Sequence, residues 1–146
     1  GLVVTGAGVV ALGIHIVHIP RIEESMRDFG ERFEQRMFTP AEAAYARAGG
    51  PRHHAQRLAA RFAAKEAAIK ALSLSEAGVD WRDIEVVHQD DGSTRHALHG
   101  KALQAARSQG IATALVCLCH DGAYAAAVVA ALSDTDEQGR REEFTA

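Results

Sequence analysis

The sequence predicts an α+β fold, in which helices pack on a small, mainly antiparallel sheet. Residues 54–72 carry the pattern of an amphipathic helix. Two Asp-Gly turn signals, Asp91-Gly92 and Asp121-Gly122, each separate segments that are rich in strand-forming residues. The resulting order of strands, helices, hairpin, helix and hairpin is typical of an α+β protein with an antiparallel sheet.

The chain is expected to begin with one or two strands. Val and Ile are frequent over residues 2–19, and the last strand should run from about residue 13 to residue 19. Pro20 suits a first helical position, because its missing N–H would have no helical partner there. We therefore expect a short helix over 21–29.

Two further helices are predicted from capping residues and periodicity. Thr39 can cap a helix in which Pro40 takes the first position and Glu42 closes a capping box. The clearest helix covers residues 54–72, because its large apolar residues recur on one stripe at about 100° per residue. Those residues are Leu58, Phe62, Ile69 and Leu72.

The second half of the chain is predicted to form two hairpins joined by a helix. We expect strands over 84–88 and 95–98 around the first turn, and over 113–120 and 124–132 around the second. The connecting helix should cover 101–109.

Length and composition favour one globular domain. The chain has 146 residues, so we assign residues 1–132 to that domain and the polar, aperiodic segment 133–146 to a disordered tail. The net charge is −3 with dispersed Lys and Arg, which predicts no nucleic-acid partner. No segment is apolar over the roughly 20 residues that a membrane span needs. Cys117 and Cys119 are expected as reduced thiols of a cytoplasmic protein.

Charged residues interrupt the apolar stripe of the longest predicted helix. Lys65 projects into the stripe, Glu66 lies at its edge, and Lys70 follows one turn later. A charge on a buried face is costly unless it is paired or used in chemistry. One interpretation is an ordinary i,i+4 ion pair between Glu66 and Lys70 on a partly solvated face. The other is a functional site.

Four segments, in the same order and at similar separations, resemble signature sequences of the holo-acyl-carrier-protein synthases. They are GIHIVHIPRI at 13–22, FEQRMFTPAEAAY at 33–45, RFAAKEAAIKAL at 61–72 and VCLCHDGAYA at 116–125. The resemblance covers roughly residues 13–132. It implies the 4′-phosphopantetheinyl transferase fold.

The resemblance also implies a transferase that moves 4′-phosphopantetheine from coenzyme A to a serine of an acyl carrier protein. Such an enzyme serves fatty acid or polyketide biosynthesis, and its Mg²⁺ bridges protein carboxylates and the coenzyme's pyrophosphate. By match, Glu66 is a magnesium ligand, while Lys65 and Lys70 contact phosphate or the reacting hydroxyl. Arg61 and His120 help to hold the coenzyme.

The match to the family's metal site is incomplete. His15 stands where the family has an aspartate metal ligand, and His18 replaces a glutamate. Gly92 opens the counterpart of a Gly-Lys-Pro loop that contacts the coenzyme, but Ser93 replaces its lysine. Imidazole is a poor ligand for Mg²⁺, so magnesium binding is expected to be weak or lost. The other departures are Cys117 and Cys119, where the family has serines.

The roles of two histidines stay open. His15 is either a packed or solvent-lined histidine or a general base near the former metal position. It should not share a metal with His18, because strand residues three apart point to opposite faces. His120 is either a coenzyme contact or a core histidine on the strand face of Val116 and Leu118.

Three functions are therefore considered. The first is the transferase. The second is a repurposed cyclase, dehydratase or isomerase with His15, Glu66 or Lys70 as acid–base groups. The third is a non-catalytic module that binds a carrier protein or coenzyme A.

The resemblance also implies homotrimers with active sites between subunits. The Ala- and Val-rich strand 124–132 points the same way, since a strand buried on both faces needs cover from helices or another chain.

Overall fold

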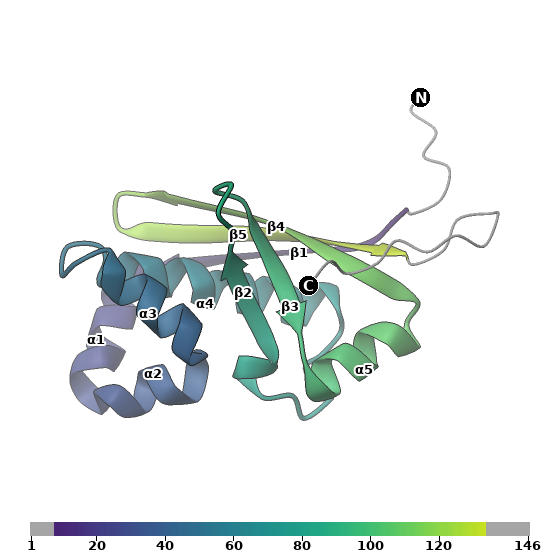
Figure 1. Cartoon of the computed structure of the whole chain (residues 1–146), viewed down its shortest axis with the longest axis horizontal. Coiled ribbons are helices and arrows are strands. Elements are labelled where there is room, and N and C mark those ends of the chain that lie inside the picture. Colours follow the sequence, from purple (N-terminus) through teal and green to yellow (C-terminus); the bar gives the residue numbers. More distant parts are fainter. Residues whose placement is uncertain (1–7, 134–146) are drawn as a thin grey trace.

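The computed structural model describes residues 8–133, which confirm the predicted α+β fold (Figure 1). One five-stranded antiparallel sheet has the strand order β1-β5-β4-β3-β2, with the helices gathered on one side of it. No helix within these residues is long and apolar enough to cross a membrane. The elements in chain order are β1 (Val9–His18), α1 (Ile19–Phe29), α2 (Glu31–Met37), α3 (Pro40–Ala48), α4 (His54–Ala71), the 3₁₀ turn η1 (Trp81–Asp83), β2 (Ile84–His88), β3 (Thr94–Leu98), α5 (Gly100–Ser108), β4 (Ile111–Asp121) and β5 (Tyr124–Ser133).

Most elements lie within two residues of their predicted bounds, but two features differ. The first described strand, β1, begins at Val9 rather than near residue 13. The short helix α2 was not predicted; it follows Gly30, whose φ of 57° ends α1 and redirects the chain. The 3₁₀ turn η1 leads into β2. The predicted tail lies outside the described residues, apart from Ser133, which ends β5.

Close contact between α4 and the sheet places the site residues of β1 beside those of α4. The helix packs along β1 and β5 through alanines that are fully buried. A Cβ atom on Gly13 would collide with the backbone carbonyl of Ala67, so only glycine permits this approach. His15, two residues along β1, therefore lies against the same helix.

Within this chain the last strand, β5, is buried on one face only, so the chain's own helices do not cover both faces. Its side chains alternate: Ala125, Ala127, Val129 and Ala131 are covered by the helix side, whereas Tyr124 and Val128 are exposed. Neighbouring strands add exposed apolar side chains to the second face. We call this surface the open face; it comprises Leu12, Ile14, Ile16, Leu115 and Val128.

Candidate active site

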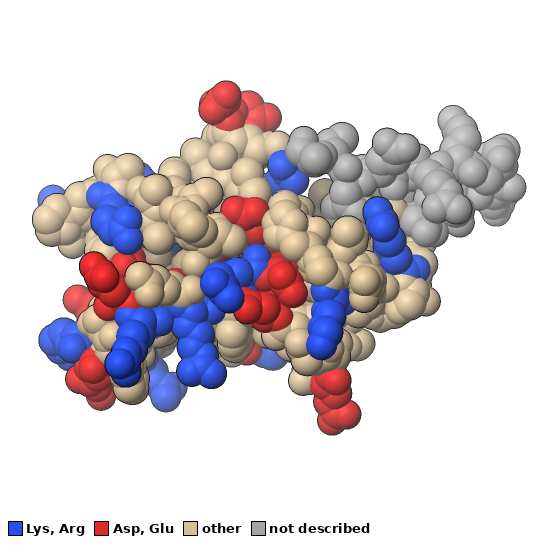
Figure 2. Space-filling view, turned by 60° about the horizontal axis from the view of Figure 1, so that its bottom comes forward, with Lys and Arg blue, Asp and Glu red and all other residues tan. Residues whose placement is uncertain are grey.

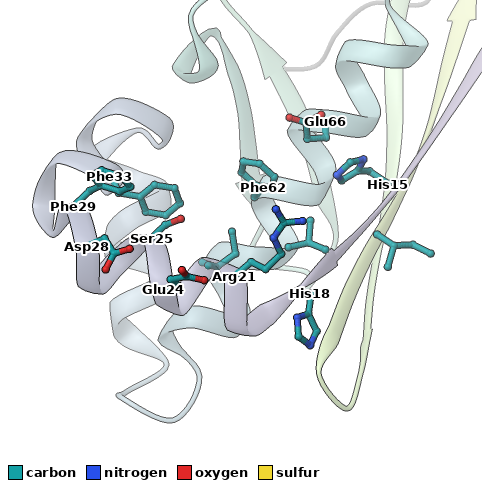
Figure 3. A pocket seen from close by; sticks show the side chains of 13 residues that line it. His15, His18, Arg21, Glu24, Ser25, Asp28, Phe29, Phe33, Phe62 and Glu66 are labelled. Carbon is teal, nitrogen blue, oxygen red and sulfur yellow. The ribbon is translucent and has the colours of Figure 1, made fainter.

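A cavity of about 480 Å³ lies between β1, α1 and α4 (Figure 3). His15 of β1 and Glu66 of α4 line it, so the structure brings together two of the predicted catalytic residues. Arg21 extends from the start of α1 toward Phe62 (Figure 3). The carboxylates of Glu24 and Asp28 also line the cavity, but from α1, across from Glu66 (Figure 3).

Lys70 contacts His15 rather than Glu66. Its Nζ atom donates to Nδ1 of His15 at 3.1 Å and to the carbonyl oxygen of Ile14 at 3.0 Å. No ion pair joins Glu66 and Lys70 among residues 8–133, so the i,i+4 interpretation is wrong. Burial lowers the pKa of His15, Glu66 acts in the opposite sense, and Lys70 lowers it further. Burial and the Lys70 charge therefore disfavour the protonated form of the imidazole.

The rings of His15 and His18 have different neighbours, although both residues line the cavity. The His15 ring packs edge-on against Phe62 of α4 at 6.4 Å between centroids, whereas His18 lies 5.0 Å from Tyr124 at the hairpin end. Within the described part of the chain, no three His, Cys, Asp or Glu side chains cluster closely enough to hold a metal ion.

Arg61 and His120 meet in a second pocket, of about 320 Å³, between α3, α4 and β4. His120 is exposed there, so its interpretation as a core histidine is wrong. The Arg61 side chain is buried beside the pocket, and its Nε atom has no hydrogen-bond partner among the described residues. An anionic oxygen would satisfy this buried donor.

Tyr45 and Arg57 are pocket residues that our sequence reasoning did not single out. The guanidinium groups of Arg57 and Arg61 lie 4.3 Å and 4.1 Å from the centroid of the Tyr45 ring. His88 stacks on the same ring at 4.5 Å. The position of Tyr45 at the end of the family-like segment 33–45 was the available signal.

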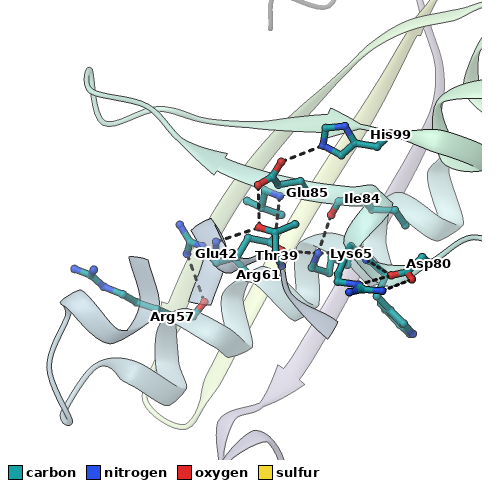
Figure 4. Close-up of polar contacts among 12 residues, drawn as sticks. Thr39, Glu42, Arg57, Arg61, Lys65, Asp80, Ile84, Glu85 and His99 are labelled. Carbon is teal, nitrogen blue, oxygen red and sulfur yellow. Dashed lines mark hydrogen bonds and ion pairs between the residues drawn. The ribbon is translucent and has the colours of Figure 1, made fainter. Parts of the chain in front are cut away.

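Lys65 is completely buried and acts within the protein's own fold (Figure 4). Its Nζ atom donates to Oε1 of Glu42 at 2.9 Å and to the carbonyl oxygens of Trp81 and Ile84, at 2.9 Å and 3.0 Å. An ammonium group has three donors, and all are in use. A contact between Lys65 and a coenzyme would require breaking one of these bonds, so we assign Lys65 a structural role.

Gly92 lies in the β2–β3 turn, with φ of 87°. Asp91 and Gln89 hold the neighbouring Ser93 hydroxyl, at 2.6 Å and 2.8 Å. Because β2 and β3 occupy the sheet edge opposite β1, Gly92 and His15 lie at opposite edges within one chain.

Comparisons with known proteins identify the family. Residues 11–129 match the model of the 4′-phosphopantetheinyl transferase superfamily. The holo-[acyl-carrier-protein] synthase of Moorella thermoacetica is 44% identical over 128 residues, covering 87% of this chain and 97% of that protein. The synthase of Koribacter versatilis is 42% identical over 122 residues, covering 83% and 96%.

This chain belongs to the holo-acyl-carrier-protein synthase family of phosphopantetheinyl transferases. A solved structure of the Helicobacter pylori holo-[acyl-carrier-protein] synthase, in complex with coenzyme A, is similar with a TM-score of 0.71. It is 26% identical and covers 82% of this chain and 98% of that one. The fold of this family member thus agrees with the expectation drawn from its sequence segments.

The residues of this synthase-family chain do not fit a magnesium site built on two adjacent carboxylates. Glu66 supplies one carboxylate, but His15 occupies the position expected for the second, and its Nδ1 atom accepts a hydrogen bond from Lys70. Mg²⁺ prefers oxygen ligands, and an ammonium group this close to the position disfavours a further cation.

Proposed function

We propose that the protein is a working holo-acyl-carrier-protein synthase, which transfers 4′-phosphopantetheine from coenzyme A to a serine of an acyl carrier protein. The observation that carries this proposal is the 44% identity to one such synthase across 97% of its length. The serine oxygen bonds to the phosphorus that bears pantetheine, the bond from that phosphorus to the bridging oxygen breaks, and adenosine 3′,5′-bisphosphate leaves. The serine hydroxyl proton is lost in the same reaction.

One group of residues would bind the coenzyme, and a second group would act on the phosphoryl group that is transferred. Arg61 and His120 would hold the coenzyme's phosphates, because their pocket combines a buried, unsatisfied guanidinium N–H with an exposed imidazole. Glu66, Lys70 and His15 would act at the phosphoryl group that is transferred. Neither the repurposed-enzyme hypothesis nor the binding-module hypothesis gains support from the relatives described above, which are synthases.

The direct test is transfer itself. Incubation of the protein with coenzyme A and an apo carrier protein should add the mass of the phosphopantetheine arm to the carrier, as seen by mass spectrometry. Glu66→Gln should lower kcat/KM at least 100-fold, about 2.7 kcal/mol of barrier, because it removes the negative charge that acts on His15 in the cavity. Glu76→Gln, exposed beyond α4, is the matched control and should retain full activity. Equal activity of the two variants would contradict the role of Glu66.

We also propose a homotrimer whose active sites lie between subunits. The cavity that holds His15 and Glu66 shares no lining residue with the pocket of Arg61 and His120, so one coenzyme has no continuous single-chain site on these residues. The open face offers an apolar surface, with Ile14 and Ile16 each about 60% exposed (58% and 61%). Contiguous apolar surface of this kind marks an association site.

Sedimentation of the wild-type protein at micromolar concentration should show a trimer. Ile14→Asp should release monomers and abolish transfer while the far-ultraviolet circular dichroism stays unchanged, since a buried carboxylate at an apolar interface is costly. Ser108→Asp adds the same charge at an exposed position in α5, and this control should remain trimeric. A fully active wild-type monomer would overturn the proposal.

The helix side of the molecule is the less suitable face for association. Its acidic and basic side chains are interspersed (Figure 2), so it has less apolar surface to bury than the open face.

A further inference from the structure

The hydrogen bond from Lys70 fixes which nitrogen of His15 carries a proton. An ammonium group can only donate, so Nδ1 of His15, 3.1 Å away, must accept with its lone pair. In a neutral imidazole whose Nδ1 atom is an acceptor, the hydrogen lies on Nε2. Protonation of Nδ1 would place two donors against each other and break this contact.

Packing holds the ring in place. Phe62 lies edge-on to His15 and is itself stacked on Trp81, with centroids 5.5 Å apart and planes inclined by 17°. The second Lys70 bond, to the carbonyl oxygen of Ile14, ties the ammonium group to the backbone beside His15. The Nε2–H group, which has no acceptor among the residues described, is therefore a pre-oriented donor at the cavity that His15 lines.

The hydrogen bonding of the His15 ring favours an acceptor group over a metal ion as its partner. One ring nitrogen is committed to Lys70 and the other carries hydrogen, so the neutral ring has no free lone pair for a metal ion. The Lys70 ammonium touches the ring and Arg21 lines the same cavity, and these two cations face the carboxylates of Glu24, Asp28 and Glu66, which line it too. A phosphoryl oxygen is the acceptor that such a group of donors recognises best.

We infer that His15 donates a hydrogen bond from Nε2 directly to a phosphoryl oxygen of the coenzyme's pyrophosphate, with Lys70 as the residue that positions it, so that coenzyme binding depends little on Mg²⁺. The inference rests on the proposed function, because it takes coenzyme A as the ligand. It assigns to His15 a binding role in place of metal coordination.

Two measurements on the intact protein test this inference. Nitrogen-15 NMR of the imidazole should show His15 as the neutral Nε2–H tautomer near neutral pH, and Lys70→Met should remove that preference. Calorimetry should give a coenzyme A Kd that differs less than about threefold between EDTA and millimolar Mg²⁺. His15→Gln, which keeps a donor near the Nε2 position, should preserve this behaviour. His15→Leu should weaken binding about tenfold in both media.

The variant His15→Asp should show the opposite behaviour, in which coenzyme binding depends on Mg²⁺. The restored carboxylate should make coenzyme binding weaker in EDTA and at least about tenfold tighter with Mg²⁺. An Nδ1–H tautomer in the wild type would overturn the inference. So would wild-type coenzyme binding that tightens tenfold with Mg²⁺, or with Mn²⁺ or Zn²⁺ in a manner abolished by His15→Leu. Coenzyme binding as expected without modification of any carrier protein would refute the proposed transferase function while supporting the role of His15.

Discussion

Replacing Lys65 by methionine should lower the free energy of unfolding by about 3–5 kcal/mol, because removing one member of a buried ion pair leaves the other charge uncompensated. The pair of Lys65 and Glu42 is fully buried on both sides. Glu42 also accepts from the backbone N–H of Val86 at 2.9 Å and of Thr39 at 2.8 Å. The ion pair thus ties α4 to the start of α3 and to β2, and its loss should affect all three elements.

Denaturant unfolding of the wild type and three variants measures this effect. Lys101→Met, at an exposed position in α5, should stay within about 0.5 kcal/mol of the wild type. The double variant Lys65→Met with Glu42→Gln removes both charges and should recover part of the loss. A Lys65→Met protein within about 1 kcal/mol of the wild type would show that water or a rearranged side chain compensates Glu42.

Lys65 also illustrates what a sequence can predict. Its position in an apolar stripe correctly indicated a charge that is either paired or used. The partner could not be deduced, because Glu42 lies on another helix and had a sufficient local role in the capping box of α3. The structure shows that the Glu42 carboxylate does both: it closes that box with Thr39 and pairs with Lys65.

Local sequence signals predicted the helices and strands well. They could not predict which faces of these elements are buried by other parts of the chain. Asp-Gly turns, helix caps and periodicity placed both hairpins and the helices α3, α4 and α5. The helix α2 was missed because its seven residues are too few to display a periodic stripe. Which face of β5 is covered depends on where α4 packs, and that information lies outside the strand's own sequence.

The site residues show the same contrast between what sequence segments indicate and what tertiary packing decides. Of the residues that the family-like segments pointed to, His15 lies beside Glu66 and Lys70, and Arg61 lies with His120 in a second pocket. Lys65 and Gly92, which were predicted to join that second group, lie elsewhere. The alternative that His120 is a core residue rested on strand alternation alone. Burial along β4 fades from Ile111 toward Asp121, because the far end of the strand borders the open pocket beside α3 and α4. Alternation predicts a face, but only packing decides whether that face is buried.

A buried histidine of β3 should make the protein's stability fall in mild acid. His96 is 1% exposed, and neither ring nitrogen has a hydrogen-bond partner among the described residues. Burial lowers the pKa of His96 from 6.5 to about 4; the backbone of Glu85 and Ala64 lies near enough to act in the opposite sense although neither makes a hydrogen bond of good geometry, and the Lys65 ammonium lowers the pKa further. The folded state therefore favours the neutral ring, whereas the unfolded chain takes up a proton below about pH 6.5.

The sign follows from this difference in proton uptake. The contribution of His96 to stability is fully present above pH 6.5 and is lost as the pH falls toward 4, where the folded protein also becomes protonated. Over that window the lost free energy of unfolding is about 3 kcal/mol, and roughly 2.5 kcal/mol of it should be gone by about pH 4.5. Other titratable groups also make the stability depend on pH, so a variant is needed to isolate the contribution of His96.

His96→Leu replaces the imidazole by an apolar side chain of similar size and should remove this part of the pH dependence. Denaturant unfolding at pH 7.5 and at pH 4.5 should show that the variant loses about 2–3 kcal/mol less than the wild type between the two conditions. His53→Gln removes one exposed imidazole and should keep the wild-type difference, which controls for the general loss of a histidine. Parallel pH profiles for the wild type and His96→Leu would mean that the buried ring is solvated or paired in solution, because only then would its protonation cease to be linked to unfolding.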